Sequence, residues 1–197
     1  MVDEESILRI FEHYFENSED IIQRGRYRFL KENGSLNILG NVIRRWGLSM
    51  PDGMWPVNFG TIHGDVDMSN CGLTSLEGSP EVVHGSMSID DNPLTNLVGL
   101  TQQISGQLNI SGINFKSLEG LPPDQSVVVS WYPNMPMLRL LTCKWIELEW
   151  FQMRDPADSH PKQVLSILRK YRRFGKKGMF DCQKELEDAG FEGNARW

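Results

Sequence analysis

This chain of 197 residues has few of the features that characterise disulfide-rich, secreted and membrane-spanning proteins. Its three cysteines, Cys71, Cys143 and Cys182, stand far apart and form no CxxC pair, which favours reduced thiols over a disulfide framework. The opening stretch, MVDEESILRIFEHYF, is acidic and lacks the character of a signal peptide. The most apolar region, which begins at Met137, is interrupted by charged side chains and cannot span a membrane. We therefore expect a cytoplasmic protein.

Catalytic and metal-binding motifs are also missing. The chain has no P-loop, GxSxG, HExxH or regular DxDxDG loop, and no short-range Cys–His arrangement. Asp90 and Asp91 are adjacent, so on a strand their carboxylates would point to opposite faces. His63 and His84 are 21 residues apart, but the matching position of the next copy holds Ser105. We therefore predict no enzymatic activity, no metal site and no cofactor.

A 21-residue period is the main feature that the sequence does contain. It relates GDVDMSNCGLTSLEG at 64–78, GSMSIDDNPLTNLVG at 85–99 and GQLNISGINFKSLEG at 106–120. Apolar and polar residues alternate at the start of each copy, as in a half-buried strand, and each copy ends in glycine. The apolar columns at the third, fifth, tenth and thirteenth positions are Val66/Met87/Leu108, Met68/Ile89/Ile110, Leu73/Leu94/Phe115 and Leu76/Leu97/Leu118.

A unit of this size cannot bury its apolar positions alone. We therefore expect successive units to stack at strand spacing around one continuous core. The glycine at the fifteenth position should turn each corner, because glycine adopts backbone angles that strain other residues. Two weaker copies flank the three clear ones. Residues 40–63 form a copy with three extra residues, and Val129 and Trp131 are assigned to the third and fifth positions of the last copy.

The regions on either side of the repeats show helical and strand periods. A glycine-containing turn separates two short strands within 27–39, and KWIELEW at 144–150 alternates like a strand. The helix around 159–175 is expected to be capped by Ser159, with Pro161 in its first turn. Helices are predicted at 4–16, 136–143, 159–175 and 177–190. These regions should close the two ends of the stack.

The motif LTSLEGSPEVVHG at 73–85 resembles the leucine-rich-repeat-like proteins of tailed bacteriophages, and so does the lead-in GSLNILGNV. The tail is similar as well, in ILRKYRRFGKKGM, KELEDAGF and GNARW. The resemblance covers roughly residues 34–197. One departure is the asparagine of the family's strand motif, which is present as Asn70 but replaced by Asp91 and Gly112 in the later copies. The resemblance implies an architecture rather than an activity, and a phage origin would make a host protein a natural partner.

These observations together predict an α+β protein built on a short leucine-rich-repeat-like β-solenoid of about four to five coils. We expect an N-terminal helix and strand cap at 1–39, the leucine-rich-repeat-like solenoid at 40–132, and a helical C-terminal cap with a basic helix at 133–197. If the chain is phage-encoded, its compartment is the host cell cytoplasm.

The polar residues between the inward strand positions should form an open face. Neighbouring strands would present them in rows, which suits an extended protein surface better than a small molecule. We therefore predict a non-enzymatic module that binds a host or phage protein. The expected partner-binding residues are Asp67, Ser69, Ser88, Asp90, Asn109, Ser111 and Tyr132.

Charge is segregated along the chain, although the net charge is −6. Residues 64–126 carry eight acids and one base, whereas 160–177 carry seven bases and no acid. A basic helix with interleaved aromatic residues could bind nucleic acid or an acidic partner. A nucleic-acid-binding regulator is therefore the alternative function, and a structural virion protein is a third. The basic patch consists of Lys162, Arg169, Lys170, Arg172, Arg173, Lys176 and Lys177.

Overall fold

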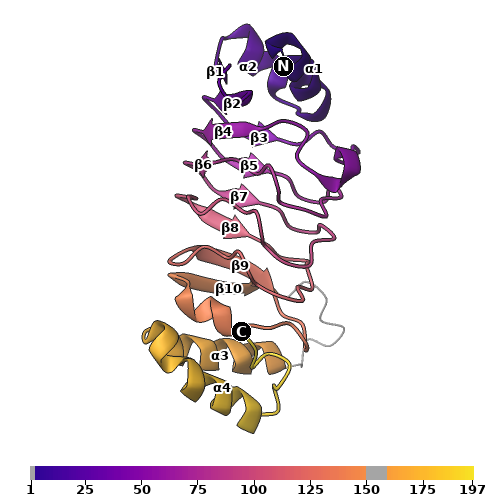
Figure 1. The fold of residues 1–197 in the computed structure, drawn as a ribbon. Coiled ribbons are helices and arrows are strands. Elements are labelled where there is room, and N and C mark those ends of the chain that lie inside the picture. The colour runs from indigo at the N-terminus through magenta and orange to yellow at the C-terminus, as the bar shows by residue number, and fades with distance from the viewer. Residues whose placement is uncertain (1–2, 150–158) are drawn as a thin grey trace.

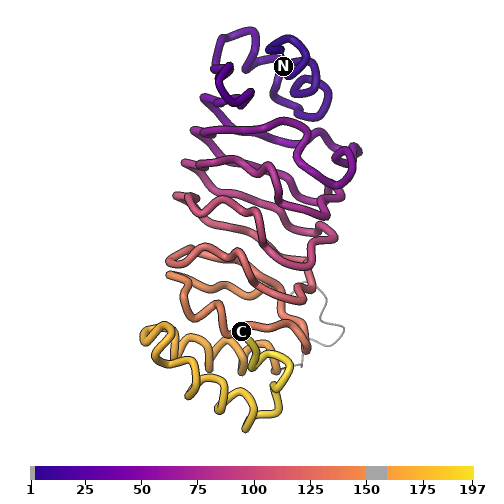
Figure 2. The backbone as a smooth tube through the Cα atoms, viewed as in Figure 1, coloured from indigo at the N-terminus to yellow at the C-terminus, as the bar shows by residue number. Residues whose placement is uncertain are grey.

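The computed structural model, which describes residues 3–149 and 159–197, is a β-solenoid of about five turns with helices at both ends (Figure 1). The expected α+β solenoid is thereby confirmed. The chain winds through successive coils that lie one above the next (Figure 2). One four-stranded sheet has the order β1 (Tyr27–Leu30), β2 (Ser35–Ile38), β4 (Phe59–Ile62) and β6 (Val82–Val83).

A second, six-stranded sheet runs along the length of the stack. In sheet order its strands are β10 (Trp145–Glu149), β9 (Ser126–Ser130), β8 (Gln107–Asn109), β7 (Met87–Ser88), β5 (Val66–Asp67) and β3 (Val42–Ile43). All its pairs are parallel. In the first sheet, β1 and β2 form the antiparallel hairpin expected within 27–39. The strand predicted at 144–150 is β10, with Trp150 outside the described residues, so the sheet continues past the boundary expected at 132.

The third repeat position forms one buried column across the coils. Val66 pairs with Met87 and Met87 with Leu108 in the parallel register, and none of the three is more than 2% exposed. The fifth-position residues beside them, Met68 and Ile89, are fully buried. The predicted column is therefore confirmed, and each coil shares its apolar surface with the coils above and below.

Glycine occupies the first repeat position because adjacent coils approach too closely for a side chain. The amide of Gly85 donates to the carbonyl of Gly64 at 3.1 Å, and that of Gly106 to Gly85 at 2.9 Å. A Cβ atom on Gly85 would lie 2.5 Å from backbone atoms of Gly64. At the fifteenth position, Gly120 has φ +93° and its Cβ would lie 2.0 Å from the Leu97 carbonyl oxygen. The glycine corners are confirmed.

The seventh repeat position is a left-handed turn residue. Asn70, Asp91 and Gly112 have φ values of 43°, 54° and 71°. These are the residue types that adopt this conformation at the lowest cost, because short polar side chains and glycine tolerate it best. Backbone conformation therefore explains why asparagine, aspartate and glycine occupy this position in the three successive copies.

A buried asparagine at the next position ties two coils together. The Asn92 side chain, 4% exposed, accepts hydrogen bonds from the amides of Cys71 at 3.1 Å and Leu73 at 2.9 Å. Its amide group donates to the carbonyls of Met68 at 2.7 Å and Ile89 at 2.9 Å. These backbone groups would otherwise be buried without partners, which costs about 1–3 kcal/mol for each.

The register of the last copy differs from the sequence prediction. Leu108 pairs with Val127 and Asn109 with Val128, so Val127 and Val129 take the third and fifth positions. The assignment of Val129 and Trp131 was wrong by two residues. Side chains alternate with a period of two, so a two-residue shift leaves the inward face unchanged and the pattern could not reveal it.

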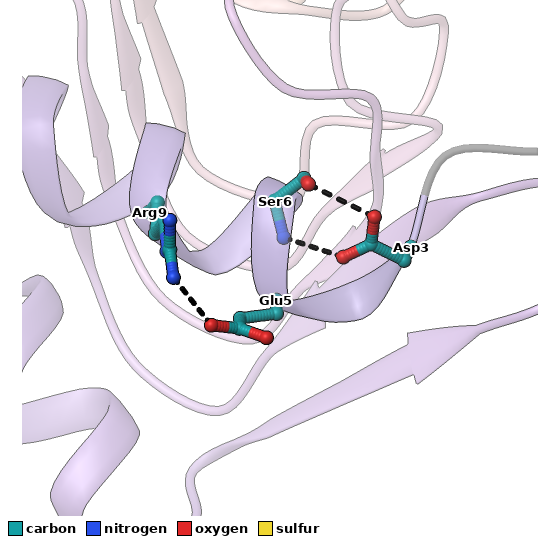
Figure 3. A network of polar contacts seen from close by, with 4 residues as sticks. All are labelled: Asp3, Glu5, Ser6 and Arg9. Atoms are coloured by element: carbon teal, nitrogen blue, oxygen red, sulfur yellow. Dashed lines mark hydrogen bonds and ion pairs between the residues drawn. The ribbon is translucent and has the colours of Figure 1, made fainter.

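The N-terminal cap consists of α1 (Glu4–Tyr14) and α2 (Ser18–Gln23). Asp3 caps α1, accepting hydrogen bonds from the Ser6 amide and hydroxyl, both at 2.9 Å, and an ion pair joins Glu5 to Arg9 (Figure 3). The bonds from Ser6 lower the pKa of Asp3. The aromatic rings of the cap, Phe11 and Phe15, are fully buried against Phe59 of the first coil.

The C-terminal cap contains α3 (His160–Arg172) and α4 (Met179–Asp188), both as expected. Two short 3₁₀ helices, η2 (Leu138–Thr142) and η3 (Gly175–Gly178), accompany them, and a third, η1 (Pro51–Gly53), lies in the first coil. The helix predicted at 136–143 is therefore present as the 3₁₀ helix η2. Ser159 is at the N-cap position, but its side chain makes no capping hydrogen bond, contrary to expectation.

Asn194 of the GNARW segment is fully buried and joins the cap to the last coil by hydrogen bonds. Its side-chain amide donates to the carbonyls of Tyr132 at 2.8 Å and Met135 at 2.9 Å, and its oxygen accepts from the Trp131 indole at 3.1 Å. Its own carbonyl accepts from the Met137 amide at 3.2 Å.

Among the helices of the described residues, none has the length and apolar character that a membrane span requires.

The shared core predicts a strong effect of a charge in the central column. Met87→Asp should lower stability by more than about 4 kcal/mol, because an unpaired carboxylate would enter a core common to several coils. The matched control is Ser86→Asp, which adds the same side chain at an exposed position where the preceding coil already has Asp65. Thermal unfolding by circular dichroism measures both variants. Equal melting temperatures for Met87→Asp and the parent would show that the repeat register is wrong.

The close approach of the coils can be tested separately from backbone strain. Gly120→Ala combines the left-handed strain with a collision against Leu97, whereas Gly190 has φ +83° and open space within 4 Å of where a Cβ atom would lie. Gly190→Ala should cost about 1–2 kcal/mol, and Gly120→Ala clearly more. Chemical denaturation of both variants provides the comparison, and similar losses would mean that strain alone fixes the corner glycine.

Candidate functional site

The outward surface of the six-stranded sheet brings together most of the residues predicted to bind a partner. Asp67 is in register with Ser88, and Ser88 with Asn109, on β5, β7 and β8. These three side chains therefore form one row across adjacent strands, as expected. We call this surface, with the sixth-position residues Ser69 and Asp90 beside the row, the strand face.

In each of these three coils, a hydrogen bond joins the side chains at the fourth and sixth repeat positions. Asp67 accepts from the Ser69 amide at 3.0 Å and from its hydroxyl at 2.5 Å. In the next coil the donor and acceptor positions are exchanged. The Ser88 hydroxyl at the fourth position donates to the Asp90 carboxylate at the sixth. Asn109 accepts from the amide and hydroxyl of the sixth-position serine at 3.1 and 2.7 Å. These bonds hold the polar side chains in fixed orientations before any partner arrives.

Two of the predicted residues differ from the expectation. Ser111 takes the expected sixth position but is only 4% exposed, and its hydroxyl donates to Asn109. Tyr132 follows the end of β9 and is outside the row, because the true register places Val128 and Ser130 at the fourth and sixth positions. Burial, followed by the charge of Asp91, raises the pKa of Tyr132.

The strand face carries two carboxylates, those of Asp67 and Asp90, and no base among the five residues that define it. Residues 64–126 contribute eight acids and a single base, Lys116. Asp90 is half-buried, and its partial loss of hydration raises the pKa of its carboxyl, while the hydrogen bond from Ser88 acts in the opposite direction. The surface therefore carries carboxylates whose charge is incompletely compensated within the solenoid.

Comparison with protein-family models, curated proteins and solved structures finds no match to this chain.

The remaining reactive side chains are poorly placed for chemistry. All three cysteines are buried, and burial raises the pKa of Cys71 to about 11 and those of Cys143 and Cys182 to about 12. These thiols stay protonated at neutral pH, which opposes a nucleophilic role. Among the described residues, no group of three or more His, Cys, Asp or Glu side chains could hold a metal ion. His63 and His84 stack on each other, with ring centroids 4.9 Å apart.

The predicted basic patch divides into cations that the fold uses and cations that remain available. Arg169 donates to the Ile146 carbonyl at 3.2 Å, and its guanidinium lies 5.3 Å from the Trp145 ring centroid. Lys170 pairs with Glu185, which raises the pKa of the lysine and lowers that of the glutamate. Lys162 also interacts with the protein. Arg172 makes a long hydrogen bond of 3.5 Å to the Cys143 carbonyl. Within the part of the chain that the structure describes, Arg172, Arg173, Lys176 and Lys177 form no ion pair.

Sequence reasoning missed Lys144, which lines a cleft together with Arg172 and Arg173. It also missed Arg139 and Trp197, which lie against each other with the guanidinium 5.7 Å from the ring centroid. No local pattern marks these residues, because they come from segments that only the folded cap brings together. The interleaving of cations with aromatic residues, noted for the basic helix, was the nearest sequence signal.

The raised pKa of Asp90 leads to a pH-dependent prediction. A carboxyl whose pKa rises on folding binds its proton more tightly in the folded state, so its ionised form costs stability above that pKa. The cost disappears as the pH falls below the folded pKa. Asp90→Asn keeps an acceptor for Ser88 without the charge, so it should melt higher than the parent at neutral pH. The difference should shrink as the pH is lowered toward the ordinary value of 3.8.

Thermal melts across this pH range provide the measurement. Glu119→Gln, which removes one exposed negative charge from the same solenoid, controls for the general relief of repulsion. A stabilisation of Asp90→Asn that is independent of pH would contradict the proposed burial of the charge.

Proposed function

We propose that this protein is a non-enzymatic protein-binding module that contacts a basic surface of its partner through the strand face. The observation that carries the proposal is the row of hydrogen-bonded polar pairs on adjacent parallel strands. The resemblance to phage proteins suggests a host or phage protein as the partner, with the host cytoplasm as its compartment.

Preorganisation supports this function. Binding normally costs free energy because interface side chains lose rotamer freedom, about 0.5–1.5 kcal/mol for each flexible side chain. The hydrogen bonds at Asp67, Asp90 and Asn109 restrict these side chains in the free protein. The backbone beneath them is part of a continuous sheet, so the surface should change little when a partner binds.

Charge supplies the second argument. Asp67 and Asp90 lie on neighbouring coils within a region that contains a single base. A partner that presents lysine or arginine would be attracted over a distance and oriented on contact, whereas an acidic partner would be repelled. The buried thiols are protonated and therefore not activated as nucleophiles, which favours binding over catalysis.

The test replaces Asp67, Asp90 and Asn109 with lysine in one variant. These side chains are on the outer surface, so the fold should survive with a modest loss of stability from the missing local hydrogen bonds. Partner capture from a lysate of infected bacteria, quantified by mass spectrometry, should fall at least about tenfold, because attraction becomes repulsion.

The matched control is a variant with lysine at Glu77, Val98 and Glu119, the fourteenth repeat positions. It also replaces two acids and one neutral residue with lysine, so the change in net charge is identical. A partner that survives the control but not the strand-face variant supports the proposal. Loss of the partner in both variants, or in neither while both remain folded, would sink it.

A further inference from the structure

The cap has a cleft of 620 Å³ at its junction with the last coils. The basic residues in its lining are Lys144, Arg172 and Arg173, which come from the segment before β10 and from the end of α3. Asp124 is the one carboxylate among the described residues that line it. Arg172 makes a long hydrogen bond of 3.5 Å to the Cys143 carbonyl, which holds its guanidinium at the wall.

Several cations around this cleft are not neutralised by acids. In the described ranges 3–149 and 159–197, no ion pair involves Lys144, Arg173, Lys176 or Lys177. This contrasts with Lys170 on the same helix, which is neutralised by Glu185. Like charges that cluster repel one another and create a local positive field, although the net charge of the protein is −6. An anionic ligand would relieve the repulsion.

Exposed aromatic rings accompany these cations. Phe174 lines the cleft and is 48% exposed, with the Arg173 guanidinium 4.6 Å from its ring centroid. Trp197, 42% exposed, lies between Arg139 and Lys176 at 5.7 and 5.9 Å. Both rings therefore lie beside cations at the cleft or on the adjoining cap surface, an arrangement that suits a ligand combining negative charge with flat groups.

We propose that this cleft and the adjoining cap surface bind single-stranded nucleic acid. Its phosphates would contact Lys144, Arg172 and Arg173, and its unpaired bases would stack on Phe174 and Trp197, since proteins that bind single strands combine a positive groove with aromatic platforms. An acidic protein would also satisfy the cations, and the competition experiment below distinguishes it from a single strand. A duplex would satisfy the cations while its bases stay stacked inside.

The site is separate from the strand face and independent of the function proposed for it. Its residues belong to the cap and the last turn, whereas the strand face lies on β5, β7 and β8. The two proposals can therefore fail independently, because the oligonucleotide experiment uses no protein partner and leaves Asp67, Asp90 and Asn109 unchanged.

The experiment measures fluorescence anisotropy of labelled oligo(dT) and oligo(rU) with the full chain over a range of salt concentrations. The variant Lys144→Gln with Arg173→Gln should bind at least tenfold more weakly. The slope of log affinity against log salt should become shallower by about 1.4, at about 0.7 for each phosphate that is no longer neutralised. The matched control, Lys31→Gln with Lys116→Gln, removes two exposed cations elsewhere and should keep its affinity within about twofold of the parent.

A second variant separates stacking from charge. Phe174→Ala should weaken binding about tenfold, because the stacking of a base on the ring would be lost, and the salt slope should stay unchanged. Phe180→Ala removes a ring that is 72% exposed on α4 and serves as its control. Circular dichroism is used to check that every variant is folded.

Several outcomes would overturn the proposal. One is an absence of oligonucleotide binding by the parent, and another is equal binding by the parent and by the folded double-glutamine variant. Equal affinity for a blunt hairpin duplex would rule out the stacking component. Competition by a poly-glutamate peptide as effective as unlabelled oligonucleotide would reassign the cleft to an acidic protein.

Discussion

The stacking of successive coils at hydrogen-bonding distance is the constraint on which the rest of this structure depends. Backbone groups of one coil satisfy those of the next, as in the bond from Gly85 to Gly64. At the corner beside these glycines, the Asp65 carboxylate accepts from the Ser86 amide at 2.7 Å, which repeats the bond from the Asp65 amide to Asn41 at 2.9 Å. Glycine is required where the backbones of two coils approach most closely, as at Gly85 and Gly120.

A stack of coils creates two open ends, and each cap has to satisfy both an apolar surface and unpaired backbone groups. At the first coil, Phe11 and Phe15 pack against Phe59, and the Arg45 guanidinium covers carbonyls at the end of α1. The last coil also combines apolar and polar contacts. Arg169 covers a carbonyl of β10, and Asn194 bridges the chain beyond β9 to the tail. The tail is therefore part of the folding unit that closes the solenoid.

Charge is distributed differently on the two candidate surfaces, and the two proposals follow that difference. The strand face lies in an acidic region and is rigid, because its polar groups bond to one another within each coil. The cap cleft combines cations with exposed rings and is built from segments that are distant in sequence. A protein with both surfaces could hold a protein partner and a nucleic acid at the same time, at separate places along one rigid stack.

The sequence by itself determined the repeat, the buried columns and the glycine corners, because each follows from a local period and from short-range backbone geometry. Tertiary structure alone decided the pairing of β9, since a two-residue shift leaves the alternation of Val127 and Val129 intact. It also decided which cations are neutralised, because Glu185 reaches Lys170 only when α4 packs on α3. Periodicity records which side of the chain faces the core, whereas register and charge pairing depend on neighbours that only the complete fold supplies.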